Sequence, residues 1–333
     1  MGSRSRPRFA AAGAGRMGRS IAIALAYAGH RISLVDLRPR TFEEVRQLHE
    51  QAHAEIAQSL RGLAQLGALR DEQVEPIAAR VEFVDAAGAA AALADVELVF
   101  EGVSETVEAK RAAFEQLGRW CRADAIVAST TSSIGAGKLA RMIAHPERFL
   151  NMHWLNPAYL IPVVEIATHA GTAPEVLARA KALMERIGKL PVVCNDTPGY
   201  IVPRLQALVM NEAARMIEEG AATAEEIDKA TRYGLGLRFA ALGVVEFIDF
   251  GGVDILHHAS REMSASIDAA RYKAPANVDR LMAEGRLGLK TGSGFFDHRG
   301  RDVGAYRNDV LSRVLAMLRH QGMWREPSNE TLD

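Results

Sequence analysis

The fold of this chain is indicated by the stretch 9-FAAAGAGRMGRSIAIALAYAGH-30, in which a short apolar run meets a glycine-rich turn and then a helical pattern. Gly13, Gly15 and Gly18 form a G-x-G-x-x-G motif. The first glycine of such a motif permits a tight turn, the second lets the backbone approach a pyrophosphate, and the third lets the helix pack closely on the strand. Because the first turn of a helix also has unpaired N–H groups that bind phosphate oxygens, the stretch predicts a dinucleotide-binding unit.

The next strand-like run, 31-RISLVD-36, ends in an acidic residue. Asp36 lies 18 residues beyond Gly18, where a carboxylate can accept hydrogen bonds from the hydroxyls of an adenosine ribose. A 2′-phosphate would meet a negative charge at this point, so the sequence favours NAD over NADP as the cofactor. Arg38 and Arg40 follow closely; they are either solvated side chains after a strand or groups that could serve a phosphate.

Strand and helix patterns alternate through the first part of the chain. Strand-like runs recur at 81–84, 96–103, 125–130, 148–154 and 190–194, with helical patterns between several of them, notably at 105–120 and 174–188. This alternation predicts an α/β fold over residues 7–195, a Rossmann-type, mainly parallel sheet covered by helices on both faces. Residues 41–80 interrupt the alternation with a polar helical hairpin that turns near Gly67, which we interpret as an arm or lid outside the core.

The second part of the chain is predicted to be helical. After the turn-rich segment 195-NDTPGY-200, strand patterns nearly vanish, and helical spacing is found at 201–219, 224–233, 244–270, 275–285 and 305–320. We therefore predict an all-helical C-terminal domain over residues 196–333. Since a helical domain with little polar cover often dimerises, we expect a homodimer through this domain.

Bulk composition excludes several classes of partner. The 333 residues carry a formal net charge of -1, which indicates neither a nucleic acid nor an anionic membrane as partner and leaves a small-molecule substrate. No apolar run approaches the roughly 20 residues that span a bilayer. The N-terminus lacks the apolar stretch and cleavage site of a secretory signal. Two cysteines, Cys121 and Cys194, make no disulfide framework, so a reducing cytoplasm is the expected location.

One histidine and one carboxylate stand in the otherwise apolar stretch 152-MHWLNPAYLIPVVEI-166. If 148–154 and 160–167 pair as antiparallel neighbours around a turn centred near Tyr159, His153 lies opposite Glu165, with Cβ atoms about 5 Å apart. A carboxylate bonded to one imidazole nitrogen sets the tautomer and leaves the other nitrogen free to take a proton from a substrate alcohol. The alternative is a core histidine with a satisfied hydrogen bond. Beside a nicotinamide, the pair predicts alcohol oxidation by hydride transfer.

No metal site is expected from the histidines. His257 and His258 are adjacent, and adjacent helical residues point roughly 100° apart, with no third ligand nearby. His49 and His53 have helical spacing but no acidic partner at ligand spacing, so we interpret them as part of a solvated helix face.

At these residues the chain resembles the L-3-hydroxyacyl-CoA dehydrogenase family across nearly all of its length. The matching segments are GAGRMG with Asp36, EGVSETVEAK, STTSS, HWLNPAYLIPVVE, DTPGYIV, MIEEGAATAEEIDKA and LGLKTGSGFF. The resemblance implies that His153 is the catalytic base and that Glu165 activates it. It also implies that Ser132 bonds the substrate hydroxyl or carbonyl and that Asn156 helps to hold His153 and the substrate.

The resemblance extends to the cofactor and to assembly. It implies that the glycine loop, including Arg16 and Met17, binds NAD together with Asp36. Glu105 and Lys110 would lie along the nicotinamide ribose. The helical domain would form a dimer, as in relatives.

Several positions depart from the family pattern. The segment 199-GYIVPRL-205 places Pro203 where the family usually has Asn, and proline has no amide to donate to a substrate oxygen. Ser59 is a candidate substrate contact, but the lysine that relatives place one to two turns later for coenzyme A is not evident. The segment 234-GLGLRFAALGVVE-246 resembles the branch that contains lambda-crystallin (a gulonate dehydrogenase) and carnitine dehydrogenase. Substrates in that branch are small free hydroxy acids. Arg238 would then be either a carboxylate anchor or a helix-surface residue.

Three functions follow from these observations. The first is an NAD-dependent dehydrogenase that converts the 3-hydroxyl of a short 3-hydroxyacyl-CoA, such as 3-hydroxybutyryl-CoA, to the 3-keto product. The second is a dehydrogenase of a free small hydroxy acid, of the gulonate or carnitine type. The third is a non-catalytic NAD-binding structural protein, as some crystallins of this fold became, and the intact pair of His153 and Glu165 argues against it.

Overall fold

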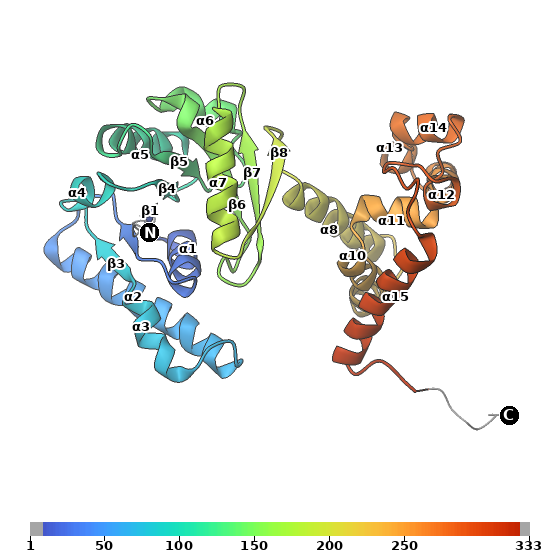
Figure 1. The fold of residues 1–333 in the computed structure, drawn as a ribbon, viewed down its shortest axis with the longest axis horizontal. Coiled ribbons are helices and arrows are strands. Elements are labelled where there is room, and N and C mark those ends of the chain that lie inside the picture. Colours follow the sequence, from blue (N-terminus) through green and yellow to red (C-terminus); the bar gives the residue numbers. More distant parts are fainter. Residues whose placement is uncertain (1–8, 327–333) are drawn as a thin grey trace. The chain divides into compact units, whose positions relative to one another are not determined.

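The computed structural model describes residues 9–326, which divide into two compact units (Figure 1). The first unit extends to Met210 and the second begins at Asn211. The division falls inside helix α8 (Val202–Glu218). The domain boundary at 195/196 therefore stays a prediction.

The first unit is built on one eight-stranded sheet. Its strand order is β3-β2-β1-β4-β5-β6-β7-β8, and every neighbouring pair is parallel except β6 and β7. This confirms the predicted Rossmann-type, mainly parallel sheet. The strands are β1 (Phe9–Ala12), β2 (Ile32–Val35), β3 (Val81–Val84), β4 (Leu98–Glu101), β5 (Ile126–Ser129), β6 (Phe149–Trp154), β7 (Val163–Thr168) and β8 (Leu190–Asn195).

Helices cover both faces of this sheet (Figure 1). Successive strand residues point to opposite faces, and in β1 all four are buried, so both faces need cover. Phe9 packs into a buried cluster with Leu25 of α1, whereas Ala10 packs into a second cluster with Phe114 of α5. The helices are α1 (Arg16–Tyr27), α2 (Phe42–Gln65), α3 (Val74–Ala78), α4 (Ala89–Leu93), α5 (Val107–Trp120), α6 (Ala136–Leu139) and α7 (Pro174–Arg186), with 3₁₀ turns at Asp71–Gln73, Ala140–Met142 and Pro146–Arg148.

The interpretation of 41–80 as an arm outside the core is wrong for α2. Ala52, Ile56, Leu60 and Leu63 are buried and belong to the same core cluster as α1. Their spacing places them on one face of the helix, so the polar residues that suggested an arm occupy only the opposite face. The hairpin turn near Gly67 is observed, and its second limb is short.

The described residues of the second unit form helices, apart from two isolated β-bridges between residues 288 and 297, which confirms the predicted helical domain. Further helices follow the end of α8. They are α9 (Ala224–Lys229), a π-helical segment Ala230–Gly236, α10 (Leu237–Ala241), α11 (Val244–Gly251), α12 (Val253–Ser266), α13 (Ala269–Tyr272), α14 (Ala276–Ala283) and α15 (Val303–His320), with a 3₁₀ turn at Leu289–Thr291. Its core centres on Val253, Val278 and Leu281. Across 9–326, none of the helices combines the length and the apolar character needed to cross a bilayer.

The continuous helix predicted over 244–270 is wrong. Gly252, with φ of 119°, separates α11 from α12, and a further break precedes α13. A Cβ at Gly252 would lie 2.4 Å from Asp254 Oδ1. The chain therefore turns at Gly252 in a conformation that a side chain would not permit.

Candidate active site

The glycine loop lies between β1 and α1 at the carboxyl edge of the sheet. Gly13 has φ of 121°, and a Cβ there would lie 2.6 Å from the Gly102 carbonyl oxygen. A Cβ on Gly18 would lie 2.0 Å from the Gly13 carbonyl oxygen. At Gly15, by contrast, a Cβ would meet nothing within 4 Å. The loop thus packs tightly on the protein side and leaves open space at the helix N-terminus, which fits a pyrophosphate.

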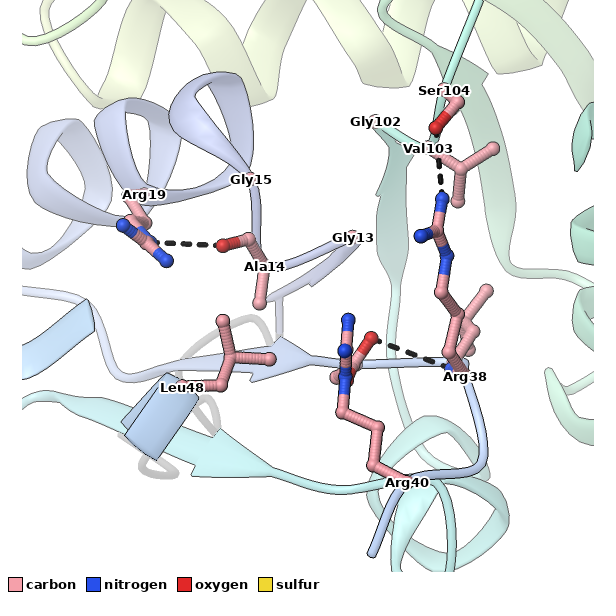
Figure 2. A pocket seen from close by; sticks show the side chains of 12 residues that line it. Gly13, Ala14, Gly15, Arg19, Arg38, Arg40, Leu48, Gly102, Val103 and Ser104 are labelled. Carbon is pink, nitrogen blue, oxygen red and sulfur yellow. Dashed lines mark hydrogen bonds and ion pairs between the residues drawn. The ribbon is translucent and has the colours of Figure 1, made fainter. Parts of the chain in front are cut away.

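A cavity of about 220 Å³ adjoins this loop at the ends of β2 and β4. Asp36 lines it, and Arg40 forms an ion pair with the Asp36 carboxylate. Figure 2 shows Arg38 crossing the cavity, where its guanidinium donates to Ser104 Oγ at 2.8 Å. Both arginines are therefore engaged in contacts and are not simply solvated. Size, loop and carboxylate together suit the adenosine end of a dinucleotide.

The other two loop residues face different surroundings. Arg16 is exposed and lines a separate cleft, described below. Met17 is partly buried against the core of the first unit. Both lie in the first turn of α1, where backbone N–H groups have no intrahelical acceptor.

The predicted register of β6 and β7 is observed, with His153 directly opposite Glu165. His153 Nδ1 lies 2.8 Å from Glu165 Oε2. The other carboxylate oxygen, Oε1, accepts hydrogen bonds from the backbone amides of Ile201 at 2.9 Å and Val202 at 2.8 Å. Glu165 is fully buried, so three donors surround a carboxylate that water does not reach.

This environment defines the chemistry open to His153. A carboxylate can only accept, so Nδ1 carries the hydrogen that it donates to Glu165. Nε2 has no hydrogen-bond partner anywhere in 9–326 and is not enclosed. The imidazole is therefore a proton acceptor at Nε2.

Tyr200 completes this arrangement and was not identified from the sequence. Its ring stacks on the His153 imidazole, with centroids 4.8 Å apart and planes within 9°. Its hydroxyl donates to the Thr131 carbonyl at 2.8 Å and accepts from Asn151 Nδ2 at 3.0 Å. Burial raises the pKa of the phenol well above its ordinary value. A tyrosine at φ of 47°, where non-glycine residues are uncommon, is visible only in the folded chain.

A buried ionic cluster lies beneath the ends of β4 and β5. Lys110 is fully buried, and its Nζ donates to both Glu101 oxygens at 3.1 and 3.0 Å. Lys110 Nζ also lies 3.2 Å from Glu105 Oε2, and Ser129 Oγ donates to Glu101 at 2.6 Å. The ammonium of Lys110 thus lies between two carboxylates and not at an exposed surface. The pairing of Lys110 with Glu101 was not predicted from the sequence.

Glu105 holds the loop that follows β5. Its Oε1 accepts from the amide of Ser132 at 3.2 Å, from Ser133 Oγ at 3.0 Å and from Thr131 Oγ1. Partial burial alone would raise the pKa of this carboxyl, but the hydrogen bond from Thr131 and the charge of Lys110 outweigh it and lower the pKa. An ionised Glu105 therefore positions the loop, and the exposed Ser132 lies on that loop.

Ser59 and Asn156 meet in a cleft of about 350 Å³ between α1, α2 and the β6–β7 connection. Arg16 also lines it, as do Arg19 of α1 and Glu55 of α2, which form an ion pair. Asn156 makes no hydrogen bond to His153 within 9–326. The structure thus groups Asn156 with Ser59.

Two further predicted positions are placed by local structure. Pro203 is the second residue of α8, in the first turn, where a missing N–H costs no intrahelical hydrogen bond. Arg238 belongs to the second unit and lies over the Phe247 ring, 5.9 Å from its centroid.

Metal ligands do not gather in the part of the chain covered by 9–326. No group of three or more histidine, cysteine or acidic side chains there is arranged to hold an ion.

Comparison with known proteins identifies the family. Residues 8–197 match the profile "3-hydroxyacyl-CoA dehydrogenase, NAD binding domain", and residues 199–298 match "3-hydroxyacyl-CoA dehydrogenase, C-terminal domain". The chain belongs to the 3-hydroxyacyl-CoA dehydrogenase family. The predicted recognition, the NAD cofactor and the class of enzyme, an NAD-dependent oxidoreductase that acts on a CH–OH group, are thereby confirmed. The hypothesis of a non-catalytic protein is set aside.

Relatives in this 3-hydroxyacyl-CoA dehydrogenase family differ in their named substrates. A 5-formyl-3-hydroxy-2-methylpyridine 4-carboxylate 5-dehydrogenase of Mesorhizobium japonicum is 30% identical over 92% of this chain and 96% of the relative. The 3-hydroxyadipyl-CoA dehydrogenase of Escherichia coli is 34% identical over 86% of this chain and 58% of the relative. A crystal structure of a 3-hydroxyacyl-CoA dehydrogenase from Archaeoglobus fulgidus covers 96% of this chain and 100% of its own, at 28% identity and a TM-score of 0.75.

Proposed function

We propose that this enzyme oxidises the 3-hydroxyl of a short 3-hydroxyacyl-CoA, such as 3-hydroxybutyryl-CoA, to the 3-keto thioester with NAD. The observation that carries the proposal is the pair of His153 and Glu165, with Nε2 free, in the sheet whose β1–α1 loop suits a pyrophosphate. Membership of a family described by this substrate class supports the thioester.

His153 is the general base in the proposed reaction. NAD, when bound, accepts the hydride that leaves the carbinol carbon. His153 Nε2 takes the hydroxyl proton as the C=O bond forms, and the product is a ketone. Glu165 then faces a positively charged imidazole at 2.8 Å and stabilises it.

The loop held by Glu105 has a positioning role in this proposal. Ser132 would donate a hydrogen bond to the substrate oxygen, and Glu105 holds the Ser132 backbone in place. Glu105 would also face the nicotinamide ribose, with Lys110 acting beneath it through their contact at 3.2 Å. Asn156 would contact the substrate from the cleft that it shares with Ser59.

A free hydroxy acid is the second candidate substrate, and the cleft favours it. Arg19 and Glu55, which form an ion pair, line the cleft beside Ser59, so its nearby cation is already paired. Residues 62–66, one to two turns after Ser59, carry no cation for a coenzyme A phosphate. Arg16 lines this cleft and makes no ion pair within 9–326, so it would bind the carboxylate of a small acid. Arg238, on the second unit, stays a predicted carboxylate anchor. The relative named for a pyridine carboxylate agrees with this alternative.

A steady-state comparison of acetoacetyl-CoA with free acetoacetate, using NADH, decides between the two substrates. We expect the thioester to have the higher kcat/KM and coenzyme A alone to inhibit competitively. A higher kcat/KM for the free acid, with no inhibition by coenzyme A, would overturn the thioester. In either case His153→Gln should lower kcat by about 10²–10⁴ while NADH still binds, because a general base contributes that much.

We also propose a homodimer through the helical unit and a cytoplasmic location. Large apolar side chains of this unit are exposed, including Ile255, Ile217 and Leu311. Such a surface is typical of an interface. Two free cysteines, Cys121 and Cys194, suit a reducing compartment. Light scattering of the purified chain tests the dimer, and a monomeric mass at micromolar concentration would refute it.

A further inference from the structure

The hydrogen bond to Glu165 does not by itself define where His153 Nε2 points. The imidazole is attached to the backbone through Cβ and is held at Nδ1 by the 2.8 Å contact with Glu165. These two points define a line, and rotation of the ring about that line would swing Nε2 through an arc. A contact against the ring face is needed to stop this rotation.

Tyr200 provides that contact. Its ring lies face to face with the imidazole at 4.8 Å and 9°, so a swing of His153 toward it would bring the two rings into collision. Tyr200 is itself buried, and its hydroxyl is held at both of its hydrogen-bonding positions, by Thr131 and Asn151. Asn151 in turn donates to the Ile134 carbonyl at 2.9 Å. The phenol ring is therefore held at its far end as well as by packing.

We infer that Tyr200 is a positioning residue for the base: its ring sets the plane of the His153 imidazole, and its hydroxyl ties that plane to the loop that carries Ser132. The hydroxyl has this role because it donates a hydrogen bond to the carbonyl oxygen of Thr131, the residue directly before Ser132. The inference rests on the proposed role of His153 but not on which substrate is used. Once protonated, the imidazole would also gain from the π face of Tyr200.

The backbone that follows Tyr200 also contacts Glu165. The next two residues, Ile201 and Val202, donate their amides to Glu165 Oε1. One short segment therefore stacks on the imidazole of His153 and donates two backbone hydrogen bonds to the carboxylate of Glu165. Both partners of the catalytic pair are thus positioned by residues 200–202.

Two substitutions separate the ring from the hydroxyl. Tyr200→Phe keeps the stack and removes the two hydrogen bonds, so we expect kcat to fall by less than about tenfold. Tyr200→Leu removes both, and we expect kcat to fall about 10- to 100-fold, since a misplacement of about 1 Å can cost that much. KM for the substrate and the Kd of NADH should stay close to wild type in both variants. Thermal unfolding with NADH present shows whether each variant is folded.

The decisive measurement combines Tyr200→Leu with His153→Gln. The double variant of Tyr200→Phe and His153→Gln measures any effect of the hydroxyl on the Ser132 loop. If the Tyr200 ring acts through the imidazole, the Leu double variant should be no slower than this Phe double variant. A further loss of kcat in the Leu double variant, equal losses for Phe and Leu, or a change confined to KM would each overturn the inference. Should His153→Gln itself retain wild-type kcat, the proposed role of His153 fails instead, so the two failures are distinguishable.

Discussion

Glu165→Gln tests which nitrogen of His153 carries the hydrogen in the proposed catalytic pair, because it changes one donor–acceptor pattern and almost no volume. In the native site Glu165 accepts at both oxygens, from His153 at Oε2 and from the amides of Ile201 and Val202 at Oε1. A glutamine keeps only one acceptor atom. It must therefore leave one side of this arrangement mismatched.

The structure indicates which side fails. If the glutamine oxygen stays with the two amides, its NH₂ group faces His153 Nδ1, which must then accept, so the hydrogen moves to Nε2 and the base is lost. The reverse orientation preserves the base but places NH₂ against two N–H donors. An unpaired buried N–H donor costs about 1–3 kcal/mol. Because Ile201 and Val202 are incompletely buried, the two unpaired amides together cost about 2–4 kcal/mol. The active form is then disfavoured about 30- to 1000-fold.

We therefore expect kcat of Glu165→Gln to fall about 30- to 1000-fold at saturating substrate, measured by NADH absorbance. The Kd of NADH should be unchanged, because Glu165 is fully buried and lies outside the glycine loop. Glu115→Gln, on an exposed position of α5, is the matched control and should behave as wild type. A folded Glu165→Gln variant with kcat within threefold of wild type would refute the assigned tautomer.

Three further predictions concern the rest of the first unit. Asp36→Ala should weaken NADH more than NADPH in fluorescence titrations, because a carboxylate that binds ribose hydroxyls is lost; equal losses would show that Asp36 does not read the ribose. Lys110→Met should destabilise the protein to urea by about 3–5 kcal/mol, since it leaves Glu101 buried without a countercharge. Adding Glu101→Gln should recover part of that loss, and no recovery would contradict the buried pair. Cys121 should resist alkylation at mildly alkaline pH, because burial raises the pKa of its thiol to about 11; modification of Cys121 in the native protein, seen by peptide mass spectrometry, would be inconsistent with that burial.

Features with a local signature could be predicted from the sequence. The glycine loop, the alternation of strands and helices, and the pairing of His153 with Glu165 all follow from spacing along the chain. The pairing of β6 with β7 is close in sequence, because only residues 155–162 separate the two strands, so a turn centred near Tyr159 was enough to predict the register. The all-helical second unit was predictable from helical spacing along the chain. The break at Gly252 was not predicted, since the adjacent Gly251 and Gly252 do not reveal which residue takes a positive φ.

Only the tertiary structure decided which groups surround the pair of His153 and Glu165. The hydrogen bond from Ser129 to Glu101, the stacking of Tyr200 on His153, and the amides of Ile201 and Val202 at Glu165 join segments that are far apart in sequence. The packing of α2 into the core was also not predicted, because the many polar residues of its other face suggested an exposed arm. Residue type and spacing by themselves indicated the pairing of His153 with Glu165. Their protonation and orientation depend on neighbours brought together by packing, and no pattern within one segment records those contacts.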